Sequence, residues 1–331
     1  MLSMLLTMAL ATAGPSGVER TIRLPTGKRG EWVALHCMAP PQPSSRSVLF
    51  VHGSSFPTDL ASGYRFAPGD SWLAYMAARG YQACGLDFRG FGDSSRPPAM
   101  KAPAAAGQPV ERAHDATDDI AVAVRYLHGA MGMAKVHLVA HSWGTIPAAA
   151  FAARDSAALA SLTLFGPIVP VPGGKDDHAP AGAWFPLTAA ERLDQLHYKG
   201  VLPAGLTLLE PAVEARWAAA FRASVPHVAG DPADRLRIPN GPNVDIVAAE
   251  RGHYPYDPAK VRLPVFVVYG SYDTVVNDAG AATFLARFTA SPLRWRLRID
   301  DGTHVMHLER NRHSLYAGVA AFIEAAGALA P

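Results

Sequence analysis

The chain has 331 residues, of which 49% are hydrophobic and 18% are charged, and its formal net charge is +2. Such a composition supports a sizeable buried core and excludes a disordered chain. The nearly neutral net charge also argues against a nucleic-acid partner, because proteins that bind nucleic acids usually carry a basic stripe.

The chain begins with an apolar stretch, M-L-S-M-L-L-T-M-A-L-A-T-A-G. Its first cationic side chain is Arg20, so the stretch lacks the basic start of a secretory signal. It is also too short for a transmembrane segment. We expect residues 1–18 to form an apolar arm that packs on the body or at an oligomer contact, in a cytoplasmic protein. A cleaved signal within residues 1–13, with secretion or export to the periplasm, is the alternative.

Two strand patterns come first, and strand and helix patterns then alternate from residue 47 to residue 168. Strands are expected at 19–24, 32–38, 47–51, 81–86, 136–140 and 161–165, and helices at 70–79, at 111–129 and from 145. Several of these strands are continuous apolar runs, which is typical of parallel strands buried on both faces. The alternation predicts an α/β fold with a mostly parallel central sheet.

The two cysteines, Cys37 and Cys84, fall in two of these strands. No metal-ligand spacing surrounds either of them, and two cysteines do not make a disulfide framework. We interpret both as buried free thiols that pack as small hydrophobic side chains.

The alternation stops between residues 169 and 262, where we find no buried strand. Prolines, scattered tryptophans and short amphipathic pieces such as 211–221 occur there instead. Strand and helix patterns resume at 264–269, 279–288 and 295–299, and a last helix ends near 329. We therefore predict a core of residues 19–168 and 263–331. A helical lid, residues 169–262, is inserted over the carboxyl ends of the strands.

One serine stands in the stretch V-A-H-S-W-G-T, between a predicted strand and a predicted helix. A sharp strand-to-helix turn would raise the Ser142 hydroxyl above the sheet edge and place helix amides beside it, as a nucleophile requires. Gly144 keeps the small residue that this turn needs, whereas Ala140 replaces the usual first glycine with one extra methyl. An ordinary helix-capping serine is the alternative.

A nucleophilic serine needs a base and an orienting acid. His304 lies in D-G-T-H-V-M-H-L-E, directly after the strand 295–299. His307 is nearer the last helix and is expected to pack or cap, and a metal site lacks a third ligand. Asp273 in G-S-Y-D follows another strand, although a turn-capping aspartate would look the same. The order Ser142, Asp273, His304 is that of an α/β-hydrolase triad.

Acyl transfer also requires donors for the oxyanion. We predict the backbone N–H of Trp143 as one donor. The other is expected from V-H-G-S-S-F, after the first buried strand, with Ser54 as first candidate and Ser55 as second. His52 is expected to shape this loop rather than to react.

With these residues in place, the chain resembles the α/β-hydrolase superfamily, and specifically its esterase-like and lipase-like serine hydrolases. The matching stretches are V-H-G-S-S-F, L-D-F-R-G-F-G-D-S-S, A-H-S-W-G, G-S-Y-D and G-T-H-V-M-H-L-E, which span residues 48 to 309. The resemblance implies a lid-bearing serine hydrolase without a cofactor, and a structural bend at Gly90 and Gly92. The H-G-S-S loop departs from proline iminopeptidases, and the serine departs from haloalkane dehalogenases, which use aspartate.

The expected reaction is hydrolysis of a carboxylic ester, lactone or thioester through an acyl-serine. Acyl transfer, amide or peptide cleavage, and a non-catalytic binding protein are the alternatives. The substrate is expected to be a small molecule with an apolar part. Aromatic side chains of the lid could line its pocket or simply form the lid's own core. They are Trp184, Phe185, Trp217 and Phe221, with Tyr254 and Tyr256 as further candidates.

Overall fold

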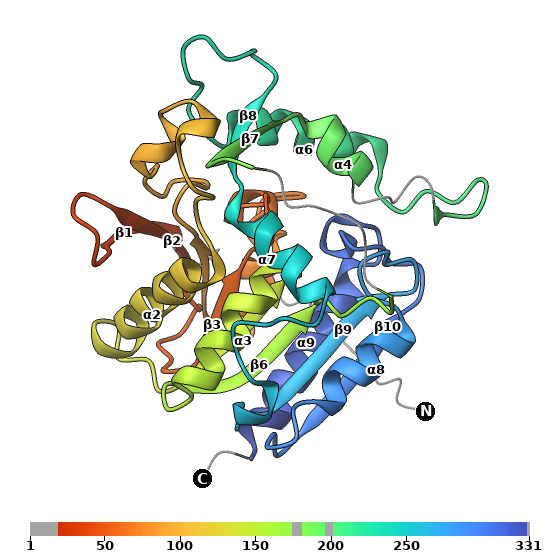
Figure 1. Cartoon of the computed structure of the whole chain (residues 1–331). Helices are drawn as coiled ribbons and strands as arrows, with labels where there is room; N and C mark the ends of the chain where they lie inside the picture. The colour runs from red at the N-terminus through yellow and green to blue at the C-terminus, as the bar shows by residue number, and fades with distance from the viewer. Residues whose placement is uncertain (1–18, 174–180, 196–200, 330–331) are drawn as a thin grey trace, which may run out of the picture.

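A computed structural model describes residues 19–173, 181–195 and 201–329. Its centre is an eight-stranded sheet with the order β1-β2-β4-β3-β5-β6-β9-β10 (Figure 1). β1 and β2 are antiparallel to their neighbours, and all other neighbouring strands are parallel. The strands are β1 (Glu19–Pro25), β2 (Trp32–Met38), β3 (Ser47–Val51), β4 (Gln82–Asp87), β5 (Val136–His141), β6 (Leu159–Phe165), β9 (Val265–Gly270) and β10 (Arg294–Ile299).

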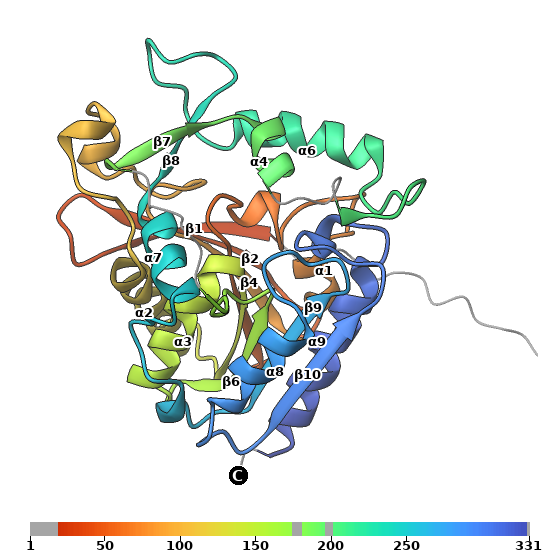
Figure 2. The same cartoon turned by 45° about the vertical axis from the view of Figure 1, so that its right-hand side comes forward.

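Helices cover both faces of this sheet (Figure 2). One face packs against α1 (Trp72–Ala77) and α9 (Arg312–Gly327), which are joined by the stacked rings of Trp72 and Tyr316. The other face packs against α2 (Ala113–Gly129), α3 (Thr145–Arg154) and α8 (Asp278–Ala286). β3, β4, β5 and β9 are consequently buried along their whole length, which explains their largely apolar sequences.

The predicted α/β fold with a mostly parallel sheet is confirmed, and most element ends lie within two residues of the expected ones. The helix expected at 70–79 is shorter. It begins at Trp72, because the Ser71 hydroxyl accepts a hydrogen bond from the amide of Ala74 and caps the helix there. Short 3₁₀ turns join the elements: η1 (Thr58–Leu60), η2 (Pro98–Met100), η3 (Ala104–Ala106), η4 (Ser142–Gly144), η5 (Pro258–Lys260) and η6 (Met306–Leu308).

The segment between β6 and β9 lies above one end of the sheet (Figures 1 and 2). It contains β7 (Trp184–Leu187), α4 (Ala189–Gln195), α6 (Pro211–Ala223), β8 (Leu236–Pro239) and α7 (Gly241–Glu250). We call it the insertion. Helices are present as expected, but the expectation that this segment has no buried strand is wrong, because β7 and β8 pair antiparallel and most of β8 is buried. Both strands have four residues, which is too short for a recognisable period.

Cys37 and Cys84 form a disulfide, so the expectation of free thiols is wrong. The antiparallel register of β2 and β4 places the two residues directly opposite each other, with their Cα atoms 4.1 Å apart. Both are buried in the core. The register between two strands distant in sequence cannot be read from composition, and it is the register that brings the two sulfurs together.

No helix within the described ranges is both long and apolar enough to span a bilayer. The expected N-terminal arm, residues 1–18, and its alternative as a cleaved signal lie outside the residues that the structure describes.

Candidate active site

Ser142 occupies the sharp turn between β5 and α3, with a φ of 55°. This left-handed conformation is strained for a side chain other than glycine and is typical of a nucleophile elbow. A Cβ atom at Gly144 would overlap the carbonyl oxygen of His52, so the second small residue of the motif is required sterically. Ala140 is fully buried and pairs with β3 and β6, so its extra methyl is accommodated in the core.

The structure brings Ser142, His304 and Asp273 together. His304 Nε2 lies 2.8 Å from Ser142 Oγ, and its Nδ1 lies 3.1 Å from each carboxylate oxygen of Asp273. The carboxylate only accepts, so the arrangement assigns the ring proton to Nδ1 and leaves Nε2 to accept from the serine hydroxyl. Ser142 is 7% exposed and His304 is 1% exposed, so this chain of hydrogen bonds is shielded from bulk water.

Asp273 is held by its own turn as well. Its Oδ1 accepts hydrogen bonds from the amides of Val275 and Val276, at 2.8 and 3.3 Å. The two interpretations of this aspartate, turn cap and histidine partner, are therefore compatible, because one carboxylate does both. The backbone bonds orient the group toward the imidazole.

Gly166, directly after β6, is a residue that sequence reasoning missed. Its φ is 53°, and a Cβ atom there would lie 2.9 Å from His304 Nδ1 and 3.1 Å from Asp273 Oδ2. Only glycine allows the backbone to pass so close to this pair. The sequence did contain a signal for this role. A glycine stands directly after a strand whose following loop supplies no carboxylate.

The loop after β3 runs beside the nucleophile. A Cβ atom at Gly53 would lie 2.9 Å from Ser142 Cβ, and Ser54 and Ser55 follow immediately. His52 donates from Nδ1 to the Gly53 carbonyl and accepts at Nε2 from the amide of Phe88. Burial lowers the pKa of His52 to about 4, so the ring is neutral and braces the loop in this tautomer.

The side chain of Trp143 is fully buried and reaches into the insertion. Its Nε1 donates to Asp245 Oδ2 at 3.2 Å, and Asp245 also accepts from Arg112 Nε at 2.7 Å and from the amide of Ala113. Burial raises the pKa of Asp245. Asp245 belongs to α7, so this carboxylate joins the insertion to the elbow and to the start of α2. No sequence motif marks it.

A second carboxylate supports the loop of the histidine. Glu309 is 1% exposed and accepts hydrogen bonds from both the amide and the hydroxyl of Thr303, the residue before His304. Burial raises the pKa of Glu309 to about 7. Within the described residues, no group of three or more histidine, cysteine, aspartate or glutamate side chains is arranged to hold a metal ion.

The aromatic residues expected in a substrate pocket make packing contacts. Trp217 and Phe221 are fully buried. The Trp217 ring packs at a tilt against Phe56, and its Nε1 donates to the Leu60 carbonyl, which anchors α6 to the loop after β3. Trp184 donates to the Ala102 carbonyl and lies under Arg237.

The other three candidates are also occupied with packing. Phe185 packs against the core cluster. Tyr254 donates to the Ile168 carbonyl and lies beside Tyr256. None of these contacts involves Ser142, His304 or Asp273, so a pocket role for the aromatic residues remains a prediction.

The sequence matches one protein family over most of its length. Residues 46–311 match the family described as alpha/beta hydrolase fold, which is well over half of the chain. The chain belongs to this family.

Several solved structures share its architecture. A serine hydrolase involved in carbazole degradation is 17% identical with a TM-score of 0.60, over 93% of this chain and 99% of that one. A thioesterase domain from the curacin biosynthetic pathway is 17% identical with a TM-score of 0.59, over 92% and 99%. A carboxylesterase from Bacillus subtilis is 14% identical with a TM-score of 0.57, over 92% of each chain. At these identities the likeness concerns the fold alone.

Proposed function

We propose that the protein is a serine hydrolase that cleaves a carboxylic ester, lactone or thioester through an acyl intermediate on Ser142. The observation that carries this proposal is the buried chain of hydrogen bonds from Ser142 Oγ through His304 to Asp273. A hydroxyl, an imidazole and a carboxylate in this order are the groups that nucleophilic acyl transfer requires.

In the proposed reaction, His304 takes the proton of Ser142 as Oγ attacks the substrate carbonyl carbon. The oxyanion is stabilised by the amides of Trp143 and Ser54. The protonated imidazole gives its proton to the leaving group, and the acyl-serine forms. His304 then activates a water molecule that releases the acid, while Asp273 keeps the Nδ1 proton in place.

We propose that the insertion, residues 169–262, acts as the lid of this site. Its α6 rests on the loop after β3 and its Tyr254 on the loop after β6, and both loops follow the carboxyl ends of strands. Ser142 is 7% exposed, and in this proposal a substrate passes the insertion to reach it. This supports a small-molecule substrate. The named activities of the structural neighbours, a thioesterase and a carboxylesterase among them, are consistent with acyl-serine chemistry.

For the compartment, we propose an oxidising one, so that a secreted or periplasmic protein is favoured over the cytoplasmic one expected from the sequence. The buried disulfide between Cys37 and Cys84 supports this, because structural disulfides persist mainly where thiols are oxidised.

A fluorophosphonate probe tests the nucleophile directly. We expect one labelled site at Ser142 in the native protein, none in Ser142→Ala, and unchanged labelling in the control Ser156→Ala, whose serine lies in the loop after α3. A panel of p-nitrophenyl esters of increasing chain length, with a lactone and an acyl thioester, then defines the substrate class. Labelling or turnover that survives in Ser142→Ala contradicts the proposal.

A further inference from the structure

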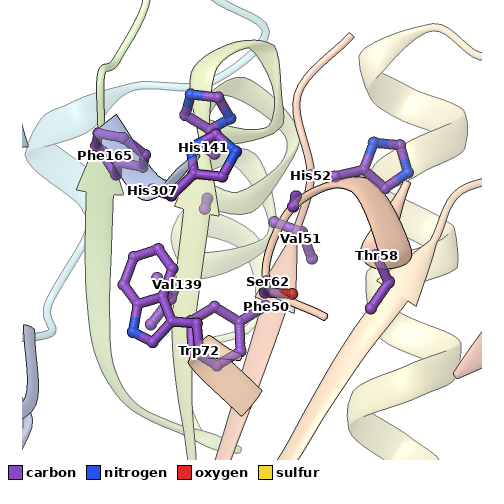
Figure 3. A pocket seen from close by; sticks show the side chains of 12 residues that line it. Phe50, Val51, His52, Thr58, Ser62, Trp72, Val139, His141, Phe165 and His307 are labelled. Carbon is purple, nitrogen blue, oxygen red and sulfur yellow. The ribbon is translucent and has the colours of Figure 1, made fainter. Parts of the chain in front are cut away.

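The residues on both sides of Ser142 are held by their side chains. His141 precedes it, and the His141 ring stacks on Phe165 at a centroid distance of 4.5 Å and lies beside His307 (Figure 3). The Nε2 atom of His141 donates to the His304 carbonyl at 2.9 Å. All three partners lie outside the insertion, so this side of the turn is held by the core.

Trp143 follows Ser142, and its side chain is held from two directions. The ring of Phe88, in the core, meets the indole in a T-shaped arrangement at a centroid distance of 5.3 Å. Asp245, in α7 of the insertion, accepts a hydrogen bond from Trp143 Nε1 at 3.2 Å. Through this carboxylate, the insertion holds the residue next to Ser142.

The helix that carries Asp245 is itself fixed to the core. The amide of Gly241, the first residue of α7, donates to the Val110 carbonyl at 2.7 Å, and a Cβ atom at Gly241 would lie 2.3 Å from that oxygen. Asp245 lies one turn later, on the same face of α7. Its Oδ1 accepts from Arg112 Nε at 2.7 Å and its Oδ2 from the amide of Ala113 at 2.6 Å. The carboxylate that meets the indole is therefore anchored, and it is only 7% exposed.

The anchored indole restrains a strained turn. Ser142 has a φ of 55°, and such a conformation persists only where the surrounding structure enforces it. The peptide group between Ser142 and Trp143 contains the amide that donates to the oxyanion in the proposed reaction. A rotation of this peptide group would relax the strain and turn the N–H away from the oxyanion. The anchored indole opposes that rotation, because the Trp143 side chain would have to move with the backbone.

We propose that Asp245 is a positioning residue for the oxyanion hole, and that it acts through the indole of Trp143 to keep the Trp143 amide aimed at the oxyanion. This inference rests on the proposed function, because it assigns a role in the reaction at Ser142. Alignment matters in such a site, since a displacement of about 1 Å can lower the rate by about 100-fold. A residue of the insertion thus contributes to the reaction without touching the substrate.

The alternative is that Asp245 only caps α2 and docks α7, so that its bond to Trp143 has no effect on the rate. Trp143→Phe separates the two roles, because it removes the indole N–H and leaves the carboxylate with its other two partners. We expect kcat to fall about 10- to 100-fold and KM to change by less than about twofold, because the oxyanion forms only as the carbonyl is attacked.

The rate at which a fluorophosphonate labels Ser142 should fall by a similar factor in Trp143→Phe, and this measurement needs no known substrate. Trp32→Phe is the matched control. Its indole N–H donates to the Asp93 carbonyl at 3.2 Å, at the start of β2, and its loss should leave the labelling rate unchanged.

Two substitutions of Asp245 test the other end of the bond. Asp245→Asn keeps an oxygen that can accept from both Trp143 Nε1 and the amide of Ala113, so it should retain most of the activity. Asp245→Leu removes both bonds, so it should reproduce the lower kcat and the slower labelling of Trp143→Phe. Circular dichroism checks that each variant is folded, and if Asp245→Leu is not, the measurements on Trp143→Phe decide.

The results distinguish this inference from the proposed function. If Ser142 of the wild type is not labelled, the proposed function fails and the positioning role fails with it. If Ser142 of the wild type is labelled, and Trp143→Phe is labelled as fast as Trp32→Phe, only the positioning role of Asp245 is overturned. A higher KM with an unchanged kcat in Trp143→Phe also overturns that role, because it would place the indole in substrate binding.

Discussion

His304 Nε2 lies 2.8 Å from Ser142 Oγ, although 162 residues separate the two in sequence. The carboxyl ends of β5 and β10 bring them to the same edge of the sheet. Asp273 completes the contact from the end of β9, so three parallel strands each supply one group. The predictions below follow from this arrangement and from the groups that support it.

Asp273→Asn is expected to lower kcat by about 10⁴-fold, because an amide favours the wrong imidazole tautomer. KM should change little, since the substitution leaves the shape of the site intact. Steady-state kinetics on the best ester of the panel measure both constants. A decrease of less than tenfold would show that Asp273 is only a turn cap.

Gly166→Ala is expected to reduce activity strongly. The new methyl would lie 2.9 Å from His304 Nδ1, and residue 166 has a left-handed φ that alanine tolerates poorly. Gly129→Ala is the matched control, because no atom lies within 4 Å of its Cβ position and its φ is not positive. Circular dichroism and kcat/KM should show a folded but impaired Gly166 variant, beside a control that keeps its activity. Equal activity in the Gly166 and Gly129 variants would mean that the loop of His304 shifts to accommodate the methyl group without loss of activity.

Glu309 should make stability depend on pH. Burial raises the pKa of Glu309 to about 7 in the folded protein, whereas its ordinary value is 4.5. At a pH between these two values, the carboxyl group is therefore protonated in the folded state and ionised in the unfolded state. The free energy of unfolding therefore falls as the pH rises through this window, by about 3 kcal/mol at most, and levels off above it.

Urea unfolding of the wild type and of Glu309→Gln between pH 5 and pH 8 measures the effect of Glu309. The glutamine variant cannot titrate, and subtracting its curve removes the contributions of other groups. The difference in unfolding free energy between the wild type and Glu309→Gln should decrease as the pH rises. A difference that does not change with pH would mean that Glu309 keeps an ordinary pKa.

The disulfide between Cys37 and Cys84 predicts how many free thiols can be titrated in the protein. The denatured, unreduced chain should show no free thiol, and two should appear after reduction. Replacing both Cys37 and Cys84 by alanine is expected to lower the free energy of unfolding by about 2–5 kcal/mol, the range typical of a native disulfide. Two thiols in protein purified without reductant would contradict the bond.

The sequence was most informative where a residue's role depends on its place along the chain. The apolar runs before Ser142 and Asp273 and the alternating pattern before His304 identified strands. Parallel strands end at a common edge, so local patterns were enough to group these residues. Glu309 and Asp245 carry no such pattern. Their environments are produced by burial, which depends on what packs over them.

By itself, the sequence determined the order along the chain of the strands and helices of the central sheet layer and the residues that stand at the ends of these strands, because both follow from local hydrophobic periodicity. Only the tertiary structure decided the rest. The pairing register of β2 and β4 joined Cys37 to Cys84, and the passage of the backbone at Gly166 beside His304 required a glycine. These features depend on contacts between residues distant in sequence, whose free energies are set by register and close packing.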